Sequence, residues 1–230
     1  MAKIYLDPGH GGKDPGAVGN GINEKDITLK ITKKIAEILK KNYVGVEILE
    51  TRTTDEYLSL SQRTDKANKW GADVFLSCHV NSSTNSAAVG FDSHIYTDVD
   101  SKTRAFQNVM HEEILRKIKP FGIANRGKKQ NDFHVLRESH MTAILTENLF
   151  ISNKADAERL KRADYITATA EGHVIGLEKF LGLKKSQQPP ESAKETLFKV
   201  QVGSFTEEEN AKALMEKLKK DGYNPFISEA

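Results

Sequence analysis

The apolar run at residues 73–80, DVFLSCHV, constrains the fold more than any other segment of this sequence. Such a run is typical of a central strand that helices cover on both faces of a parallel sheet. Strand-like segments at 3–6, 46–49, 90–97, 133–137 and 143–146 surround it in the chain, together with segments of helical periodicity at 23–39, 60–70, 102–119 and 154–181. This alternation predicts an α/β domain with a twisted, mostly parallel sheet and helices on both faces.

Charge and cysteine content limit the partners and the kinds of metal site. Lys and Arg number 34 and Asp and Glu 32, so the formal charge is 34 − 32 = +2, which gives no reason to expect nucleic acid or an anionic membrane as a partner. The single cysteine, Cys78, excludes a disulfide within the chain and a cysteine-rich zinc finger. No apolar stretch has the length of a signal peptide or a membrane span, so we expect synthesis in the cytoplasm.

Three potential metal ligands are expected at one edge of the sheet. His10 follows the first strand, Glu24 lies in the first turn of a helix that Asn23 can cap, and His79 ends the central strand. Two imidazoles, one carboxylate and a fourth position left to water form a catalytic zinc set, whereas structural zinc sites close with four protein ligands. The alternatives are polar residues that only hydrogen-bond at strand ends, or a phosphate-binding loop at 9–16, which lacks the Gly-Lys-Ser/Thr ending.

Glu147 follows the apolar run at 143–146, so it should project from the same edge. A carboxylate beside a zinc-bound water can act as general base and then as general acid, which suggests hydrolysis of an amide. Arg137 is a candidate for holding a substrate carboxylate or carbonyl, and Asn81 for contacting substrate, although a salt bridge and a loop cap are the alternatives. The histidines with no partner suggesting chemistry are interpreted as surface or structural residues: His94, His111, His140 and His173.

Four segments in order resemble the motifs of the zinc-dependent N-acetylmuramoyl-L-alanine amidases of the amidase-3 family: DPGHGG at 7–12, NEK at 23–25, SCHVNS at 77–82 and TENLFISN at 146–153. The resemblance covers residues 2 to 183. It implies that His10, Glu24 and His79 bind zinc and that Glu147 is the catalytic carboxylate. The implied substrate is peptidoglycan, cut between N-acetylmuramic acid and the L-alanine of the stem peptide. Cys78 stands where the family has an apolar residue, and we interpret it as a core residue.

The remaining chain is expected to be a linker at 184–196 and a β-α-β unit at 197–230, after a catalytic domain at 1–183. The segment FKVQVGSF at 198–205 and the helix behind it are similar to one half of a SPOR domain, a family that binds peptidoglycan, preferentially glycan strands stripped of peptides. A unit this short buries little apolar surface. We therefore expect it to pack on the catalytic domain or, preferably, to complete its sheet in a homodimer.

Two other functions stay open at this point. The amidase-like domain could bind peptidoglycan without cutting it, although a binder has no need of an intact set of His10, Glu24, His79 and Glu147. A zinc peptidase that acts on the stem peptide is the second alternative. The residues fit a phage endolysin and a sporulation autolysin equally, each acting on the cell wall after release from the cytoplasm.

Overall fold

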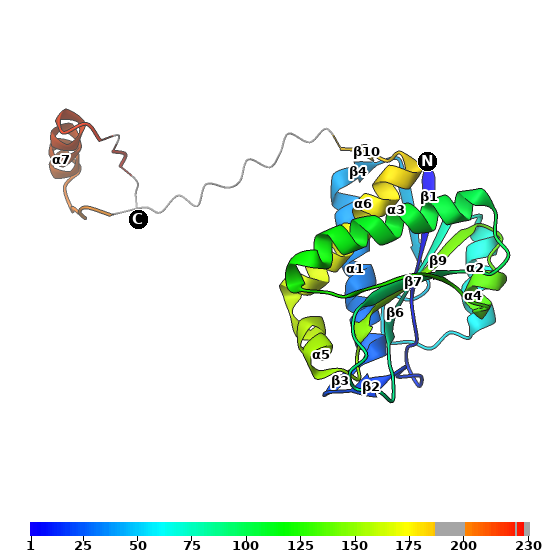
Figure 1. Cartoon of the computed structure of the whole chain (residues 1–230). Coiled ribbons are helices and arrows are strands. Elements are labelled where there is room, and N and C mark those ends of the chain that lie inside the picture. The colour runs from blue at the N-terminus through cyan, green and yellow to red at the C-terminus, as the bar shows by residue number, and fades with distance from the viewer. Residues whose placement is uncertain (187–200, 224, 228–230) are drawn as a thin grey trace. The chain divides into compact units, whose positions relative to one another are not determined.

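The computed structural model describes residues 1–186, 201–223 and 225–227. It divides into two compact units, Met1–Ser186 and Gln187–Ala230 (Figure 1). No helix among the described residues has the length and apolar character needed to cross a membrane.

The first unit is built on one six-stranded sheet with the strand order β5-β1-β6-β9-β7-β8. Neighbouring strands run parallel except for β7 and β9, which are antiparallel, so the prediction of a mostly parallel sheet is confirmed. The central position of β6 agrees with its apolar sequence. The strands in sheet order are β5 (Val46–Glu50), β1 (Ala2–Pro8), β6 (Val74–Asn81), β9 (Thr142–Phe150), β7 (Phe91–Ile95) and β8 (Asn125–Gln130).

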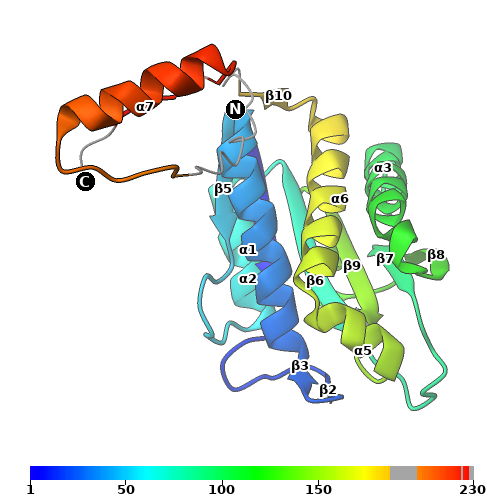
Figure 2. The same cartoon turned by 90° about the vertical axis from the view of Figure 1, so that its left-hand side faces the viewer.

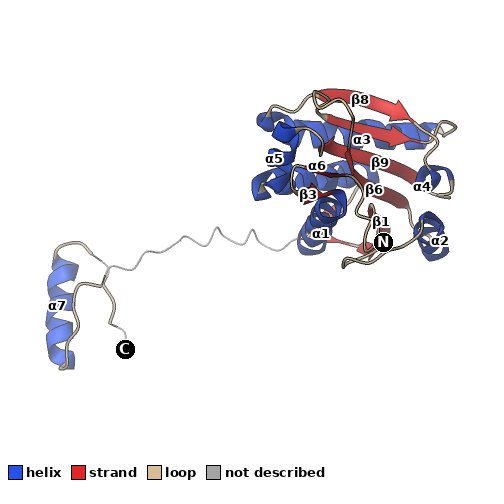
Figure 3. Ribbon diagram, turned by 90° about the horizontal axis from the view of Figure 1, so that it is seen from below, coloured by secondary structure: helices blue, strands red, loops and turns tan. Residues whose placement is uncertain are grey.

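Helices cover both faces of this sheet (Figures 2 and 3). Three long helices pack side by side on one face, with α6 between α1 and α3. Two shorter helices, α2 and α4, contact each other on the opposite face. The helices are α1 (Glu24–Asn42), α2 (Leu60–Trp70), α3 (Ser101–Ile118), α4 (His134–Arg137), α5 (Lys154–Lys161) and α6 (Ala163–Leu181).

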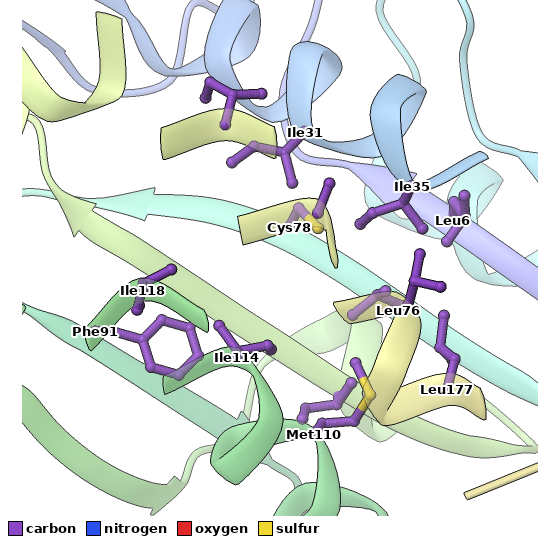
Figure 4. Close-up of a cluster of buried hydrophobic side chains, with 14 of the residues drawn as sticks. Leu6, Ile31, Ile35, Leu76, Cys78, Phe91, Met110, Ile114, Ile118 and Leu177 are labelled. Carbon is purple, nitrogen blue, oxygen red and sulfur yellow. The ribbon is translucent and has the colours of Figure 1, made fainter. Parts of the chain in front are cut away.

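Strand alternation divides the core into two layers. One layer lies under α1, α3 and α6 and includes Leu6, Leu76 and Cys78 (Figure 4). Cys78 is fully buried there, in agreement with its interpretation as a core residue, and burial raises the pKa of its thiol to about 12. The opposite layer lies under α2 and α4 and includes Tyr5, Phe75, Ala67, Val135, Leu136, Ala143 and Leu145.

Several short elements complete the unit. A 3-10 turn, η1 (Lys119–Phe121), follows α3, where the sequence predicted that Pro120 stops the helix. Two small antiparallel pairs join β2 (Val18–Gly19) to β3 (Ile22–Asn23) and β4 (Tyr43–Val44) to β10 (Lys184–Lys185).

The sequence prediction is wrong for two segments on the β8 side of the sheet. Residues 125–130, expected as a polar loop, form β8, which pairs with β7 alone and so needs no apolar alternation. Residues 133–137, expected as a strand, contain the one-turn helix α4. Val135 and Leu136 are consecutive and both buried, which a strand with alternating faces does not allow when one face is solvated.

Two helix predictions also need correction. The helix expected over 154–181 is two helices, because Arg162 between them has an extended backbone (φ −82°, ψ 130°). This break lets Leu160 and Tyr165 both reach the core, although five residues do not return to one face of a continuous helix. Asn23 precedes α1 as expected but makes no side-chain cap; its amide donates to Asp26 Oδ2 instead.

The second unit contains α7 (Glu208–Lys220), with acidic residues in its first turn and lysines in its last, as the helix dipole favours. Strands were expected at 197–202 and 223–228. The described parts of these segments, 201–202, 223 and 225–227, are not strands, and the other residues lie outside the described part of the chain. A strand needs a neighbour for its backbone hydrogen bonds, and a lone pair of strands is barely stable.

Candidate metal centre and active site

The structure brings His10, Glu24 and His79 together. One potential ligand atom from each residue lies within 4.8 Å of the other two. Glu24 stands between the two imidazoles, with Oε2 3.2 Å from His10 Nε2 and Oε1 3.0 Å from His79 Nδ1. Three elements meet here, since His10 follows β1, Glu24 begins α1, and His79 lies within β6 and not at its end.

Two glycines make this convergence possible. A Cβ atom on Gly9 would lie 2.4 Å from His79 Cε1, far inside van der Waals contact. A Cβ atom on Gly16 would lie 2.6 Å from His10 Cδ2 and 2.7 Å from Glu24 Oε2. Gly16 also has a positive φ of 66°, which side-chain-bearing residues seldom adopt. The loop that carries His10 therefore depends on glycine for space as much as for its turns.

Glu24 has hydrogen-bond donors on both carboxylate oxygens. Val80 N–H donates to Oε1 at 2.9 Å and Ala17 N–H donates to Oε2 at 2.9 Å, in addition to the two imidazoles. Burial alone would raise the pKa of Glu24, but the hydrogen bonds from His10 and His79 outweigh burial and lower this pKa far below its usual range. Glu24 is therefore an anion held in a fixed orientation.

Asp14 orients His10 from behind. Its Oδ2 lies 2.8 Å from His10 Nδ1, so the imidazole turns Nε2 toward Glu24. A carboxylate behind a histidine is the usual support of a metal-binding imidazole. With two imidazole nitrogens and one carboxylate oxygen, the donor set fits a zinc ion that keeps a position open for water.

Glu147 lies on β9 directly beside His79, which is its neighbour in the β6–β9 register. Its Oε2 is buried and finds no hydrogen-bond partner among the described residues. Burial, followed by the negative charges of Glu24 and Asp92, raises the pKa of Glu147 well above its ordinary value. In contrast to Glu24, this carboxyl is suited to carrying a proton.

A cavity of about 290 Å³ lies beside these groups. His10, His79, Glu147 and His134 line it with three charged residues, Asp7, Asp14 and Arg63, and with an apolar set consisting of Tyr57, Leu58, Leu60, Phe133, Val135 and Leu145. Polar groups that converge within a largely apolar pocket are typical of small-molecule and peptide sites.

The other candidates from the sequence lie elsewhere. Arg137 bonds to Asp132 and Glu138 and lines a different cavity, so it does not reach the Glu147 site. Asn81 Oδ1 accepts a hydrogen bond from Ser82 N–H at 2.9 Å, which is the loop-cap alternative. His94, His111 and His173 are buried and hydrogen-bonded, and His140 is exposed, as expected for structural or surface residues.

Two features of the site were not predicted from the sequence: the carboxylate of Asp14 and the burial of His134. The spacing of four residues between His10 and Asp14 was a usable signal, because a short Gly-rich loop can fold a carboxylate back onto its histidine. Nothing in the pattern at 133–137 indicated that a ring nitrogen of His134 would be buried at the cavity wall.

Comparisons with known proteins identify the family. The sequence profile of the N-acetylmuramoyl-L-alanine amidases matches residues 4–179, and that of the SPOR domain matches residues 179–229. The sporulation-specific N-acetylmuramoyl-L-alanine amidase of Bacillus subtilis is 45% identical over 227 residues, covering 99% of this chain and 84% of the relative. The endolysin of Bacillus phage SPP1 is 46% identical over 184 residues, covering 79% of this chain and 67% of the relative.

Solved structures give the same result. The catalytic domain of CwlV, an N-acetylmuramoyl-L-alanine amidase from Paenibacillus polymyxa, superposes with a TM-score of 0.75 at 36% identity, covering 80% of this chain and all of that one. An N-acetylmuramoyl-L-alanine amidase from Clostridium difficile has a TM-score of 0.75 at 33% identity, covering 79% of this chain and 97% of its own. The chain therefore belongs to the N-acetylmuramoyl-L-alanine amidase family.

Proposed function

We propose that this amidase hydrolyses the amide bond between N-acetylmuramic acid and the L-alanine of the stem peptide, with zinc held by His10, Glu24 and His79 and proton transfer by Glu147. The observation that carries the proposal is the contrast between Glu24, whose two carboxylate oxygens both accept hydrogen bonds, and Glu147, whose buried Oε2 has no partner among the described residues. When bound, zinc polarises the scissile carbonyl and lowers the pKa of a water molecule.

The protein residues divide the remaining work. Glu24 and the two histidines supply fixed donors, with His10 oriented by Asp14. The Glu147 carboxylate takes a proton from the attacking water and gives it to the departing alanine nitrogen, which is general base and then general acid catalysis. The raised pKa of Glu147, caused by burial and the charges of Glu24 and Asp92, favours a carboxyl that holds this proton between the two steps.

Product analysis tests this function against its alternatives. Purified peptidoglycan is digested, and new amino groups are identified by N-terminal labelling. We expect new L-alanine amino groups, released in equal number with peptide-free lactyl carboxyl groups on the glycan. New amino groups on other stem residues would instead identify a zinc peptidase. Binding without any new amino groups would identify a non-catalytic peptidoglycan-binding protein.

The tail is proposed to target the enzyme to the wall and to form a homodimer. Its match to the SPOR domain supports binding to peptidoglycan. Apolar side chains of the described tail stay exposed, including Val202 (62%), Phe205 (48%) and Tyr223 (66%), and a second copy would cover them. Sedimentation of the full chain beside a form that ends at Leu183 tests the dimer: two monomers would refute it, and a dimer only with the tail would support it.

The proposed place of action is the cell wall. Two relatives support this proposal, a sporulation-specific N-acetylmuramoyl-L-alanine amidase and a phage endolysin, because both are similar in sequence to the catalytic unit of this chain.

A further inference from the structure

His134 lines the same cavity as Glu147, and its ring nitrogen Nε2 is buried. Nε2 of this half-buried imidazole is shielded from water and makes no hydrogen bond to any described residue. A buried polar atom left without a hydrogen bond costs about 1–3 kcal/mol, and native proteins seldom leave one without a reason. A ligand that supplies the missing partner is such a reason.

The wall that carries His134 is firmly anchored. Val135 and Leu136 are each 4% exposed and pack in the core layer under α2 and α4. The ring of Phe133 lies 5.3 Å from the ring of His94, between centroids. The segment after α4 is tied to α2, since Asn68 donates to Glu138 O at 2.8 Å and accepts from His140 N–H at 2.9 Å. The backbone that carries His134 is therefore held in place by its neighbours on both sides.

The neighbours of His134 in the cavity indicate what it binds. Val135 and Leu145 line the same cavity and offer only apolar surface. An alanine methyl group fits such a surface, whereas a sugar ring presents hydroxyl groups that need several polar partners. A peptide group next to that methyl offers both an N–H and a C=O, so it can pair with Nε2 of either imidazole tautomer.

We propose that His134 Nε2 hydrogen-bonds a peptide group of the stem peptide next to the scissile bond, making His134 a specificity-determining residue for the peptide side of the substrate. This inference rests on the proposed amidase function. Glu147 and the three candidate ligands then serve the reaction, and His134 serves recognition of the peptide.

The test replaces His134 by leucine, glutamine and asparagine in the full chain. We expect His134→Leu to lower kcat/KM on peptidoglycan roughly 10- to 100-fold, with zinc content unchanged. His134→Gln should recover most of this loss, because its terminal amide reaches the position of Nε2. His134→Asn places its amide near Nδ1 and should not. His140→Leu is the matched control, an exposed histidine that lines a different cavity.

Binding and stability separate recognition from a structural role. In a Glu147→Gln background, the affinity for N-acetylmuramoyl-L-alanyl-D-isoglutamine is measured by calorimetry and should fall by a similar factor with His134→Leu, while binding to peptide-free glycan stays unchanged. The melting temperature should stay the same or rise, because an unpartnered polar atom leaves the protein interior.

Three results would overturn the inference: unchanged kcat/KM and affinity, an equal loss of binding to peptide-free glycan, or a lower melting temperature together with loss of zinc. If the unaltered chain cleaves nothing, the proposed function fails by itself, and the binding comparison still decides the role of His134.

Discussion

The two glutamates of the site lie in opposite hydrogen-bonding environments. Glu24 has a donor on each carboxylate oxygen, and Glu147, one strand away from His79, has a buried oxygen with none among the described residues. The histidines repeat the contrast beyond the metal cluster. His173, on the other face of the sheet, makes hydrogen bonds through both ring nitrogens, whereas His134 Nε2 has no partner in the described part of the chain.

This difference indicates how residues that hold a buried polar site in place can be distinguished from residues that bind substrate or transfer protons. A saturated group is fixed in position and in charge, which suits a metal ligand or a structural link. An unsaturated buried group retains the capacity to bind or to move a proton, and its desolvation is tolerated where function requires it. Variants that exchange or remove these two kinds of group test whether the distinction holds.

Removal of one of the three proposed zinc ligands should have the largest effect on metal content and activity. His79→Ala is expected to reduce bound zinc from about one ion per chain to nearly none and to end hydrolysis, because two remaining donors hold the ion weakly. Elemental analysis and peptidoglycan digestion measure the two losses. His140→Ala, an exposed histidine, should keep both properties. Full activity of metal-free His79→Ala, or of chelator-treated enzyme, would refute the zinc assignment.

Replacement of Glu147, the carboxyl group with an unpartnered buried oxygen, should stop catalysis without loss of bound zinc. Glu147→Gln keeps the shape of the side chain and cannot accept a proton, so kcat is expected to fall by about 10²- to 10⁴-fold. Zinc content should equal that of the unaltered chain. If Glu147→Gln loses zinc as well, Glu147 contributes to metal binding, and the proposed distinction between the zinc ligands and the proton-transfer residue is wrong.

The sequence was sufficient to predict a mostly parallel sheet with helices on both faces, and the convergence of His10, Glu24 and His79. These features depend on long apolar runs and on strand ends that topology brings to one edge. β8 was not predicted because it is an edge strand with a neighbouring strand on one side only, and such a strand can consist of polar residues. The α4 segment was misread because F-H-V-L-R offers too few residues to distinguish a period of two from a period of 3.6.

The sequence could not predict which buried side chains have hydrogen-bond partners. Whether an oxygen of Glu147 or a nitrogen of His134 finds a partner depends on the distances between β9, α4 and the loops, and not on residue type. The glycines were visible in DPGHGG, but the close approach of Gly9 to His79 joins residues 70 positions apart in the chain. Motif spacing thus located the site, and packing divided its residues by role.

A weaker effect is expected from the carboxylate behind His10. Asp14→Asn removes the charge that faces His10 Nδ1 at 2.8 Å and should lower zinc affinity about 10- to 100-fold, with the fold intact. Competition with a chelator of known affinity measures the change. Asp164→Asn is the control, since Asp164 pairs with Arg162 on the surface. An unchanged affinity for zinc in Asp14→Asn would show that the Gly-rich loop alone orients His10.

The smallest effect concerns His173, the saturated imidazole, and appears in stability. Burial lowers the pKa of His173 from 6.5 to about 4, with a hydrogen bond to Thr169 O opposing it. As the pH falls below 6.5 the unfolded chain takes up the proton first, so the folded state loses stability between pH 6.5 and about 4 and is unaffected above that window. From pH 7 to pH 5 this loss amounts to about 2 kcal/mol.

The free energy of unfolding, measured with urea as a function of pH, tests this expectation. His173→Gln should lack this part of the pH dependence, whereas His140→Gln should retain it. Equal pH dependence in all three proteins would mean that the unfolded chain gains no proton at His173 relative to the fold, and that hydrogen-bond saturation does not fix the charge of a buried side chain here.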